Sequence, residues 1–293
     1  MVNRSPSRRG LLTGALTTLA AGLAAQAGAD TPSEIPLWPN VPPGSDGVSV
    51  KETLTDNREK SDQINRSITG VRIPTLNLVR PKTPNGAGVL VLPGGGFNSL
   101  AYDKEGTEVA AWLATLGFTA AALKYRLPAD GWKAGIDVAV QDGQRALRLL
   151  RQEMKGGKVG VMGFSAGGYL AAALATRFNE RLDGQVDQAD AQSARPDFAA
   201  LVYPGFGSDA QGIPEIGKKV TSDTSPAFIV HAADDPKAPP GGSILATARL
   251  LSLKVPVELH LFETGGHGFA LRRPPADHWP DLFKTWVEAR LKA

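Results

Sequence analysis

The sequence lacks cysteine altogether, and this absence excludes a disulfide framework and any metal site built on thiolates. It also lacks internal repeats, low-complexity tracts and a linker composition that would separate two domains. Its 293 residues are enough to bury one large hydrophobic core. We therefore expect a single domain over residues 48–293, preceded by an extended surface arm over residues 30–47 that is rich in proline and glycine.

Acidic residues are missing from residues 1–29, which carry three arginines, an apolar stretch at 11–25 and an Ala-Gly-Ala sequence ending at Ala29. These are the three parts of an export signal, and the apolar part is too short to span a membrane. Residues 7–12 (SRRGLL) resemble the twin-arginine motif of proteins exported in folded form. We expect a cleaved signal peptide and a periplasmic or secreted protein, with the general secretory route as the alternative.

An excess of either charge is also lacking once that leader is removed. The whole chain has 32 basic and 29 acidic residues, and removal of the three leader arginines leaves 32 − 3 = 29 basic residues. A net charge near zero gives no support to nucleic-acid or anionic-membrane binding. We expect neither as a partner, and the sequence carries no signal for an oligomeric state.

What the sequence does have is a regular alternation of strand and helix patterns. Short connections between them are typical of an α/β fold with a mostly parallel central sheet and helices on both faces. Residues 67–71 and 75–79 look like a hairpin or an edge pair. Further strands are predicted at 48–54, 87–92, 118–123, 159–162, 198–203, 227–231 and 257–262, and helices at 105–116, 138–151, 244–252 and 279–291 and after residue 170.

The most informative stretch is residues 158–170, which read KVGVMGFSAGGYL. A short apolar strand pattern precedes residues 163–167 (GFSAG), and an alanine-rich helix pattern follows them. A G-x-S-x-G turn between strand and helix is typical of a serine held in strained backbone geometry at the carboxyl edge of a sheet. A glycine-rich connection that happens to contain serine is the alternative. The flanking strand and helix favour the first interpretation, so Ser165 is the candidate nucleophile.

A glycine run, residues 93–97 (PGGGF), directly follows the predicted strand 87–92. Glycines leave backbone N–H groups unshielded and able to bind a ligand. A dinucleotide-binding fingerprint needs glycine or alanine where Ser99 stands, and no helix begins at once. We therefore prefer an oxyanion hole facing the serine, with a purely structural turn as the remaining alternative.

Histidine is scarce, with four residues in the chain. His231 and His260 fall within apolar strand runs and are expected to be packed, and His278 begins a polar helix and is expected to be solvated. His267 lies in residues 264–269 (TGGHGF), a flexible loop just beyond the last predicted strand. A base must stand there to reach a serine at the carboxyl edge of the sheet, so His267 is the candidate base.

An acid is needed to orient that histidine and to stabilise its protonated form. Asp234 and Asp235 follow the predicted strand 227–231, again at the carboxyl edge. The chain order of serine, aspartate and histidine is the order expected of α/β-hydrolases. At this level of reasoning either aspartate can be the acid.

These motifs resemble those of the α/β-hydrolase esterases grouped with acetyl xylan esterases and bacterial feruloyl-type esterases, often labelled xylanase-associated lipase or esterase proteins. The resemblance extends over nearly the whole chain beyond the leader. Its most specific pieces are residues 92–97 (LPGGGF), 125–127 (YRL), 141–146 (QDGQRA), 161–171 (VMGFSAGGYLA), 195–198 (RPDF), 203–204 (YP) and 258–269 (ELHLFETGGHGF).

The resemblance implies a catalytic triad and an oxyanion hole. The triad would consist of Ser165, Asp235 and His267, and the hole of the backbone N–H groups of Gly95 or Gly96 together with Ala166.

The sequence departs from the family pattern at two places. Tyr169 stands where the family often has histidine, and residues 234–243 (DDPKAPPGGS) carry a lysine and a glycine where the family has an apolar residue and an asparagine. These differences bear on the rim of the acyl pocket rather than on the triad.

The resemblance implies an exported serine carboxylesterase that removes acetyl groups from plant polysaccharides such as xylan and needs no metal or organic cofactor. Phe97, Phe164 and Tyr169 are large enough to close a shallow acyl pocket, and Trp132 is the candidate for an open aromatic rim under the sugar. Alternatives are a broad-specificity carboxylesterase or lipase-like hydrolase, a peptidase of the same fold, and a non-catalytic binding module. A glycan-cleaving enzyme is disfavoured because no pair of carboxylates is set across a cleft in the manner of glycosidases.

Overall fold

The computed structural model describes residues 33–58, 63–206 and 219–292. The predicted leader therefore lies outside the described residues, as does most of the irregular stretch 205–223, which the sequence suggests as a cap or rim.

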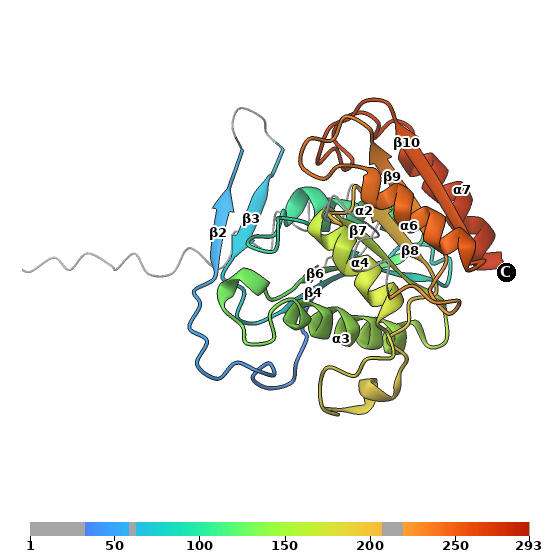
Figure 1. Ribbon diagram of the computed structural model, residues 1–293. Coiled ribbons are helices and arrows are strands. Elements are labelled where there is room, and N and C mark those ends of the chain that lie inside the picture. Colours follow the sequence, from blue (N-terminus) through green and yellow to red (C-terminus); the bar gives the residue numbers. More distant parts are fainter. Residues whose placement is uncertain (1–32, 59–62, 207–218, 293) are drawn as a thin grey trace, which may run out of the picture.

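An eight-stranded sheet forms the centre of the molecule, in the order β1-β4-β6-β5-β7-β8-β9-β10 (Figure 1). The five pairings from β6 to β10 are parallel, whereas β1 and β4 are antiparallel to their neighbours. The mostly parallel α/β sheet predicted from the sequence is confirmed. The strands are β1 (Ser33–Pro36), β4 (Thr75–Val79), β5 (Gly88–Leu92), β6 (Thr119–Lys124), β7 (Val159–Phe164), β8 (Ala199–Val202), β9 (Ala227–Ala232) and β10 (Val257–Phe262).

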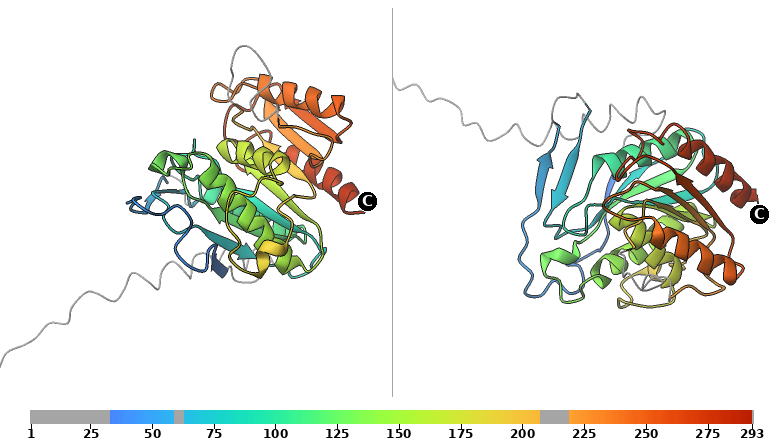
Figure 2. Two further views of the ribbon diagram at one scale, coloured as in Figure 1. Left: turned by 60° about the horizontal axis from the view of Figure 1, so that its bottom comes forward. Right: turned by 45° about the horizontal axis from the view of Figure 1, so that its top comes forward.

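Helices cover both faces of this sheet, so its central strands are buried over their whole length (Figures 1 and 2). One hydrophobic core lies under α3 (Asp137–Met154), α4 (Ala166–Thr176) and α6 (Gly241–Ser252). The other lies under α2 (Glu108–Thr115) and α7 (Trp279–Lys292). Three short helical turns complete the described part of the chain: the π-helix η1 (Asp103–Thr107) and the 3-10 turns η2 (Pro128–Asp130) and η3 (Gln188–Ala191).

The predicted pairing of residues 67–71 with 75–79 is wrong. β3 (Arg66–Thr69) pairs with β2 (Thr53–Asp56) in a separate two-stranded ribbon, while β4 lies inside the main sheet between β1 and β6. The ribbon stands out from the body of the molecule in Figure 1. β4 is buried at four of its five positions, and this burial explains why it pairs with the sheet rather than with its neighbour in sequence.

The arm over residues 30–47 is also more firmly fixed than expected. Its described part begins with β1 at the sheet edge and continues into Leu37 and Trp38, which are buried. The Trp38 Nε1–H donates to Asp142 Oδ1 at 2.9 Å. Asp142 in turn forms a fully buried ion pair with Arg126, at 2.7 Å from Nη2 to Oδ1. Through its bond to Trp38, Asp142 anchors the arm to the body of the domain. Removal of either charge of the pair would leave the other buried and unpaired.

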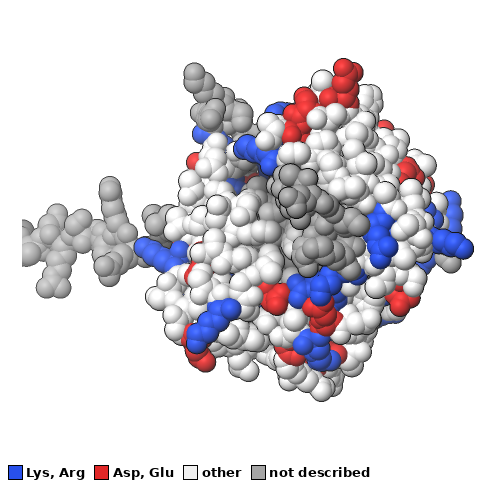
Figure 3. All heavy atoms as spheres, viewed as in Figure 1, with Lys and Arg blue, Asp and Glu red and all other residues white. Residues whose placement is uncertain are grey.

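Charged side chains are interspersed by sign on the face shown in Figure 3, with no broad area of one sign among the described residues. Within that part of the chain, the helices are too short or too polar to cross a bilayer.

Candidate active site

Ser165 occupies the tight turn between β7 and α4. Its backbone has φ +52° and ψ −119°, the strained geometry that a G-x-S-x-G turn imposes. The two glycines of the motif are required by close approach. A side chain at Gly163 would meet the Gly167 carbonyl oxygen at 2.0 Å, and one at Gly167 would meet the Leu92 oxygen at 2.0 Å. The small residues therefore let the turn close and present the serine hydroxyl at the carboxyl edge of the sheet.

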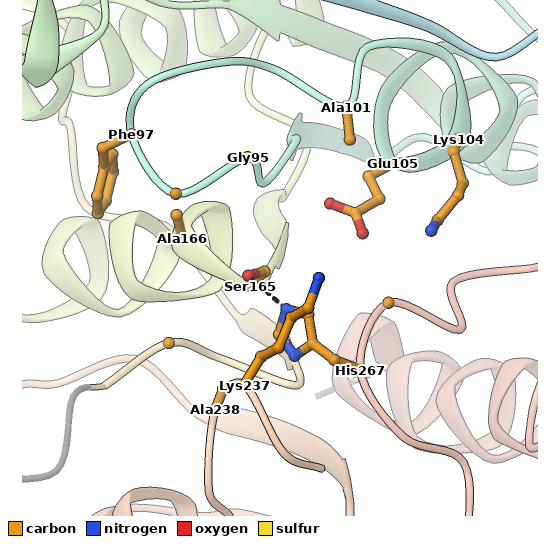
Figure 4. Close-up of a pocket in the computed structure, with 13 residues that line it drawn as sticks. Gly95, Phe97, Ala101, Lys104, Glu105, Ser165, Ala166, Lys237, Ala238 and His267 are labelled. Carbon is orange, nitrogen blue, oxygen red and sulfur yellow. Dashed lines mark hydrogen bonds between the residues drawn. The ribbon is translucent and has the colours of Figure 1, made fainter. Parts of the chain in front are cut away.

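His267 lies in the loop after β10 and reaches that hydroxyl. Its Nε2 is 2.8 Å from Ser165 Oγ, as the dashed line in Figure 4 shows. Glycines at positions 265, 266 and 268 have positive φ values, so the loop bends sharply on both sides of the histidine. The Arg273 guanidinium donates to the His267 carbonyl oxygen at 2.6 Å and fixes the backbone of the loop.

Asp235 lies on the far side of the imidazole, with Oδ2 at 2.7 Å from His267 Nδ1. Its other oxygen accepts the backbone N–H groups of Lys237 and Ala238, each at 2.9 Å. Burial by itself raises the pKa of Asp235, but the N–H groups of Ala238 and Lys237 and the ring of His267 outweigh it and lower that pKa below its usual value. The carboxylate is therefore ionised at neutral pH and accepts a hydrogen bond from His267.

The neighbouring acid has a different position. Asp234 is exposed, and its Oδ1 accepts the Gly266 N–H at 2.8 Å, so it supports the loop rather than the imidazole. His231 lies behind Asp235 and is fully buried, with Nε2 at 2.7 Å from the Ala238 oxygen and Nδ1 at 2.8 Å from Ser243 Oγ. Burial lowers the pKa of His231, which keeps this ring neutral beside the aspartate.

The glycine loop, residues 93–97, faces the serine across a pocket of ≈ 530 Å³. The pocket is lined by Gly95 and Gly96 together with Ser165, Ala166 and His267. In the described part of the chain, the backbone N–H groups of Gly95, Gly96 and Ala166 donate no hydrogen bond. Three free donors therefore border the space in front of Ser165 Oγ, and such donors can stabilise an oxyanion.

The aromatic residues predicted for substrate binding take different places. Phe97 lines the pocket, and Tyr169 packs edge-to-face against it at 5.9 Å between ring centroids. Phe164 is wholly buried against Tyr203, in the core on the side of the sheet that α2 and α7 cover. Its expected place in the acyl pocket is therefore wrong. The expected open rim at Trp132 is wrong as well, because this side chain is 4 % exposed. It packs under the Arg126 guanidinium, 5.0 Å from the ring centroid, and does not line the pocket.

Two charged residues that sequence reasoning did not select, Lys104 and Glu105, line the pocket. Lys237, the lysine that departs from the family pattern, lines it as well. Glu105 is buried, whereas Lys237 is exposed. Burial lowers the pKa of Lys104, and Glu105 partly opposes this effect. A glutamate at a predicted helix start is ordinary in sequence terms, so no local signal distinguished Glu105. No cluster of three or more histidine or acidic side chains suited to a metal ion occurs among residues 33–58, 63–206 and 219–292.

The sequence is similar to a family of known proteins and to two curated relatives. Residues 76–207 match the model of the BD-FAE family. An acetylxylan esterase of Xylanibacter ruminicola is 27 % identical over 218 residues, which are 64 % of this chain and 42 % of that protein. The endo-1,4-beta-xylanase B of Butyrivibrio fibrisolvens is 28 % identical over 207 residues, 62 % of this chain and 32 % of that protein. The chain thus spans less than half the length of these curated relatives.

Solved structures are also similar over most of the chain. The acetyl ester-xyloside bifunctional hydrolase of Caldicellulosiruptor lactoaceticus has a TM-score of 0.66 and 27 % identity, covering 88 % of this chain and 96 % of that one. The α/β-hydrolase MGS-M1, from a deep-sea metagenome of the Medee basin, has a TM-score of 0.60 and 23 % identity, covering 84 % and 100 %.

The sheet order, the serine turn and these structures define the class: the protein has the α/β-hydrolase fold. Within that class it is similar to acetylxylan esterases and to the BD-FAE family, and the resemblance seen in its motifs is confirmed.

Proposed function

We propose that this protein is an exported serine carboxylesterase that hydrolyses short acyl esters, above all acetyl esters on plant polysaccharides such as xylan. One observation carries the proposal. A continuous hydrogen-bonded series from Ser165 through His267 to Asp235 opens into the same pocket as three backbone N–H groups that have no partner among the described residues. This is the arrangement that acyl transfer through a serine requires.

In the proposed mechanism, Ser165 Oγ attacks the ester carbonyl carbon while His267 Nε2 takes the hydroxyl proton. Asp235 holds the Nδ1–H of the ring, so that Nε2 is the acceptor, and stabilises the imidazolium. The N–H groups of Ala166 and of Gly95 or Gly96 stabilise the tetrahedral oxyanion. The oxyanion collapses as His267 returns the proton to the leaving alcohol, and an acyl-enzyme remains. Water, deprotonated by His267, then attacks the acyl carbon and releases the acid and the free serine.

The alternatives are a broad-specificity carboxylesterase, a peptidase of the same fold and a non-catalytic binding module. A binding module has no need of a serine, a histidine and a buried aspartate joined in one hydrogen-bonded series. Labelling with a fluorophosphonate separates it from the enzymes, since this reagent reacts with an activated serine. A protein that is folded but never labelled would favour the binding module.

Short acyl groups should be the preferred substrates. We expect kcat/KM to fall from acetyl through butyryl to octanoyl esters, and acetate to be released from acetylated xylan. Each methylene in a hydrophobic pocket is worth only about 1–3 kcal/mol, so the decline will be graded and Phe97, braced by Tyr169, must exclude the longest chains. A panel of p-nitrophenyl esters and an acetate assay on xylan measure both. If octanoyl esters are the best substrates and acetylated xylan yields no acetate, the protein is a lipolytic carboxylesterase instead.

Export should depend on the arginine pair. We expect protein released beyond the inner membrane to begin near Asp30, and the double substitution Arg8→Lys with Arg9→Lys to retain the precursor inside the cell. Arg4→Lys is the matched control and should be exported normally. N-terminal sequencing of released protein that still starts at Met1 would contradict cleavage, and normal export of the double variant would favour the general secretory route.

A further inference from the structure

A buried carboxylate forms part of the pocket wall without belonging to the hydrogen-bonded series of Ser165. Glu105 is 4 % exposed and lines the same pocket. Figure 4 shows its carboxylate pointing into the pocket from η1, across from the loop that carries His267. Its Oε2 accepts the Gly94 N–H at 2.9 Å, and its Oε1 accepts the Tyr203 hydroxyl at 2.9 Å. A carboxylate is costly to bury unless such bonds satisfy it, so its environment is specifically built.

The first of these bonds fixes the start of the glycine loop. The peptide group between Pro93 and Gly94 is held from both ends, because the Pro93 oxygen accepts the buried Tyr125 hydroxyl at 2.8 Å. The next carbonyl, that of Gly94, accepts the Ala101 N–H at 2.9 Å. In a planar trans peptide the N–H points opposite to the carbonyl, so a fixed Gly94 carbonyl also fixes the direction of the following N–H. That N–H belongs to Gly95, one of the three unpaired donors.

The bond to Gly94 also decides which glycines can serve the oxyanion. Because Glu105 occupies the Gly94 N–H, this group is withdrawn from the pocket. Within the described part of the chain, the donors of the loop that stay free are those of Gly95 and Gly96. A side chain on Gly94 would lie 2.8 Å from Ser165 Cβ and 2.7 Å from Glu105 Oε2. Gly94 is therefore packed between the serine and the glutamate, and any shift of Glu105 reaches the serine turn directly.

The second bond leads to the catalytic histidine of the proposed mechanism. Tyr203 follows β8 and has a left-handed backbone, with φ +37°. Its ring packs edge-to-face on the imidazole of His267, with 5.1 Å between ring centroids. Burial and the neighbouring Glu105 raise the pKa of Tyr203 well above its usual value, so its hydroxyl stays protonated and donates to the carboxylate. Glu105 thus holds the ring against which His267 rests.

We propose that Glu105 is a positioning residue that joins the glycine loop to the ring supporting His267, so that the oxyanion donors and the base keep their mutual geometry. This inference rests on the proposed esterase function. Glu105 touches neither the nucleophile nor the reacting atoms, and it acts through Gly94 and Tyr203. Loss of Glu105 should therefore weaken stabilisation of the transition state rather than binding of the substrate, because the oxyanion donors and the proton on His267 are used only in the transition state.

The test compares Glu105→Leu, Glu105→Gln and Glu108→Gln for hydrolysis of p-nitrophenyl acetate. Glu108 lies in the next helical turn and pairs with Arg272 away from the pocket lining, so its variant is the matched control for loss of a carboxylate. Competent sites are counted by exhaustive fluorophosphonate labelling, so that a loss of folded protein lowers the count and leaves the rate per site unchanged.

We expect Glu105→Leu to lower kcat per site about 10²-fold with KM changed less than about 3-fold, as removal of an oxyanion donor does. Inhibition by a boronic acid, which forms a tetrahedral serine adduct, should weaken by the same factor. Glu105→Gln should keep kcat within about 10-fold of the wild type, because its amide oxygen can accept the Gly94 N–H while its NH₂ donates to Tyr203. Glu108→Gln should match the wild type.

A rate per site in Glu105→Leu equal to that of Glu108→Gln would overturn the proposal, as would a rise in KM with kcat unchanged. If Glu105→Leu does not fold, Tyr203→Phe decides: we expect kcat to fall about 3- to 10-fold at constant KM, and an unchanged kcat would overturn the proposal. Wild-type protein that hydrolyses no ester and takes no label would overturn the esterase function and this inference together. An active wild type with normal Glu105 variants would overturn this inference alone.

Discussion

Substitution of Ser165 by alanine should lower kcat for acetyl ester hydrolysis by roughly 10⁵-fold or more, because the Ser165 hydroxyl is the group that His267 can activate for acyl transfer. The same variant should take no fluorophosphonate label. Alanine tolerates the φ of +52° no worse than serine does, so the turn between β7 and α4 should keep its shape. Circular dichroism and thermal unfolding check the fold, and single-turnover assays measure the residual rate.

The matched control for that variant is Ser225→Ala. Ser225 is a fully buried serine whose hydroxyl donates to the Pro196 oxygen at 2.6 Å, away from the residues that line the pocket. Its loss should cost about 1 kcal/mol of unfolding free energy or somewhat more and leave kcat unchanged. Substantial esterase activity in Ser165→Ala protein, purified free of the host's esterases, would show that a different residue is the nucleophile.

Asp235→Asn should lower kcat by on the order of 10⁴-fold, and Asp234→Asn by only a few-fold. The structure gives the reason. Asp235 Oδ1 accepts two backbone N–H groups, so the oxygen of an asparagine would turn to them and its NH₂ would face His267 Nδ1. The ring would then carry its proton on Nε2 and would be unable to accept the proton of Ser165. KM should change little, because the substrate does not touch Asp235.

Asp234→Asn is the matched control for that result. It lies one position away and removes one carboxylate as well, but its amide oxygen can still accept the Gly266 N–H that Asp234 Oδ1 now binds at 2.8 Å. Both variants are compared by kcat over the pH range in which the wild type is stable. A larger loss in Asp234→Asn than in Asp235→Asn would assign the acid to Asp234.

The strands at the centre of the fold could be predicted from the sequence almost to the residue. The predicted strand 227–231 ends one residue before β9 does, and 87–92 differs from β5 by one residue. Short continuous apolar runs bounded by turn residues are typical of strands buried on both faces, so these strands have a clear local signal. The weaker patterns at 67–71 and 75–79 were paired with each other wrongly. Pairing depends on partners distant in sequence: β4 meets β6 more than forty residues later.

The general position of the candidate site could also be predicted. Ser165, the aspartate pair and His267 each follow a strand of a parallel sheet, and the carboxyl ends of such strands meet at one edge. The preference for Asp235 came from the family pattern, and the structure places that residue, rather than Asp234, against the imidazole. Adjacent side chains at a strand end point in different directions, so a difference of one position separates a partner of the imidazole from a support of the loop.

The sequence by itself thus determined the fold class, the central strands and the edge of the sheet at which the chemistry-bearing residues gather. Only the tertiary structure decided the surroundings of single side chains. Phe164 and Trp132 proved to be buried away from the pocket, and Glu105 proved to face it. The physical reason is that backbone conformation follows from neighbours a few residues apart, whereas burial and hydrogen-bond partners are supplied by segments far away in the sequence. Glu105, for example, accepts its hydrogen bond from Tyr203, which lies 98 positions further along the chain.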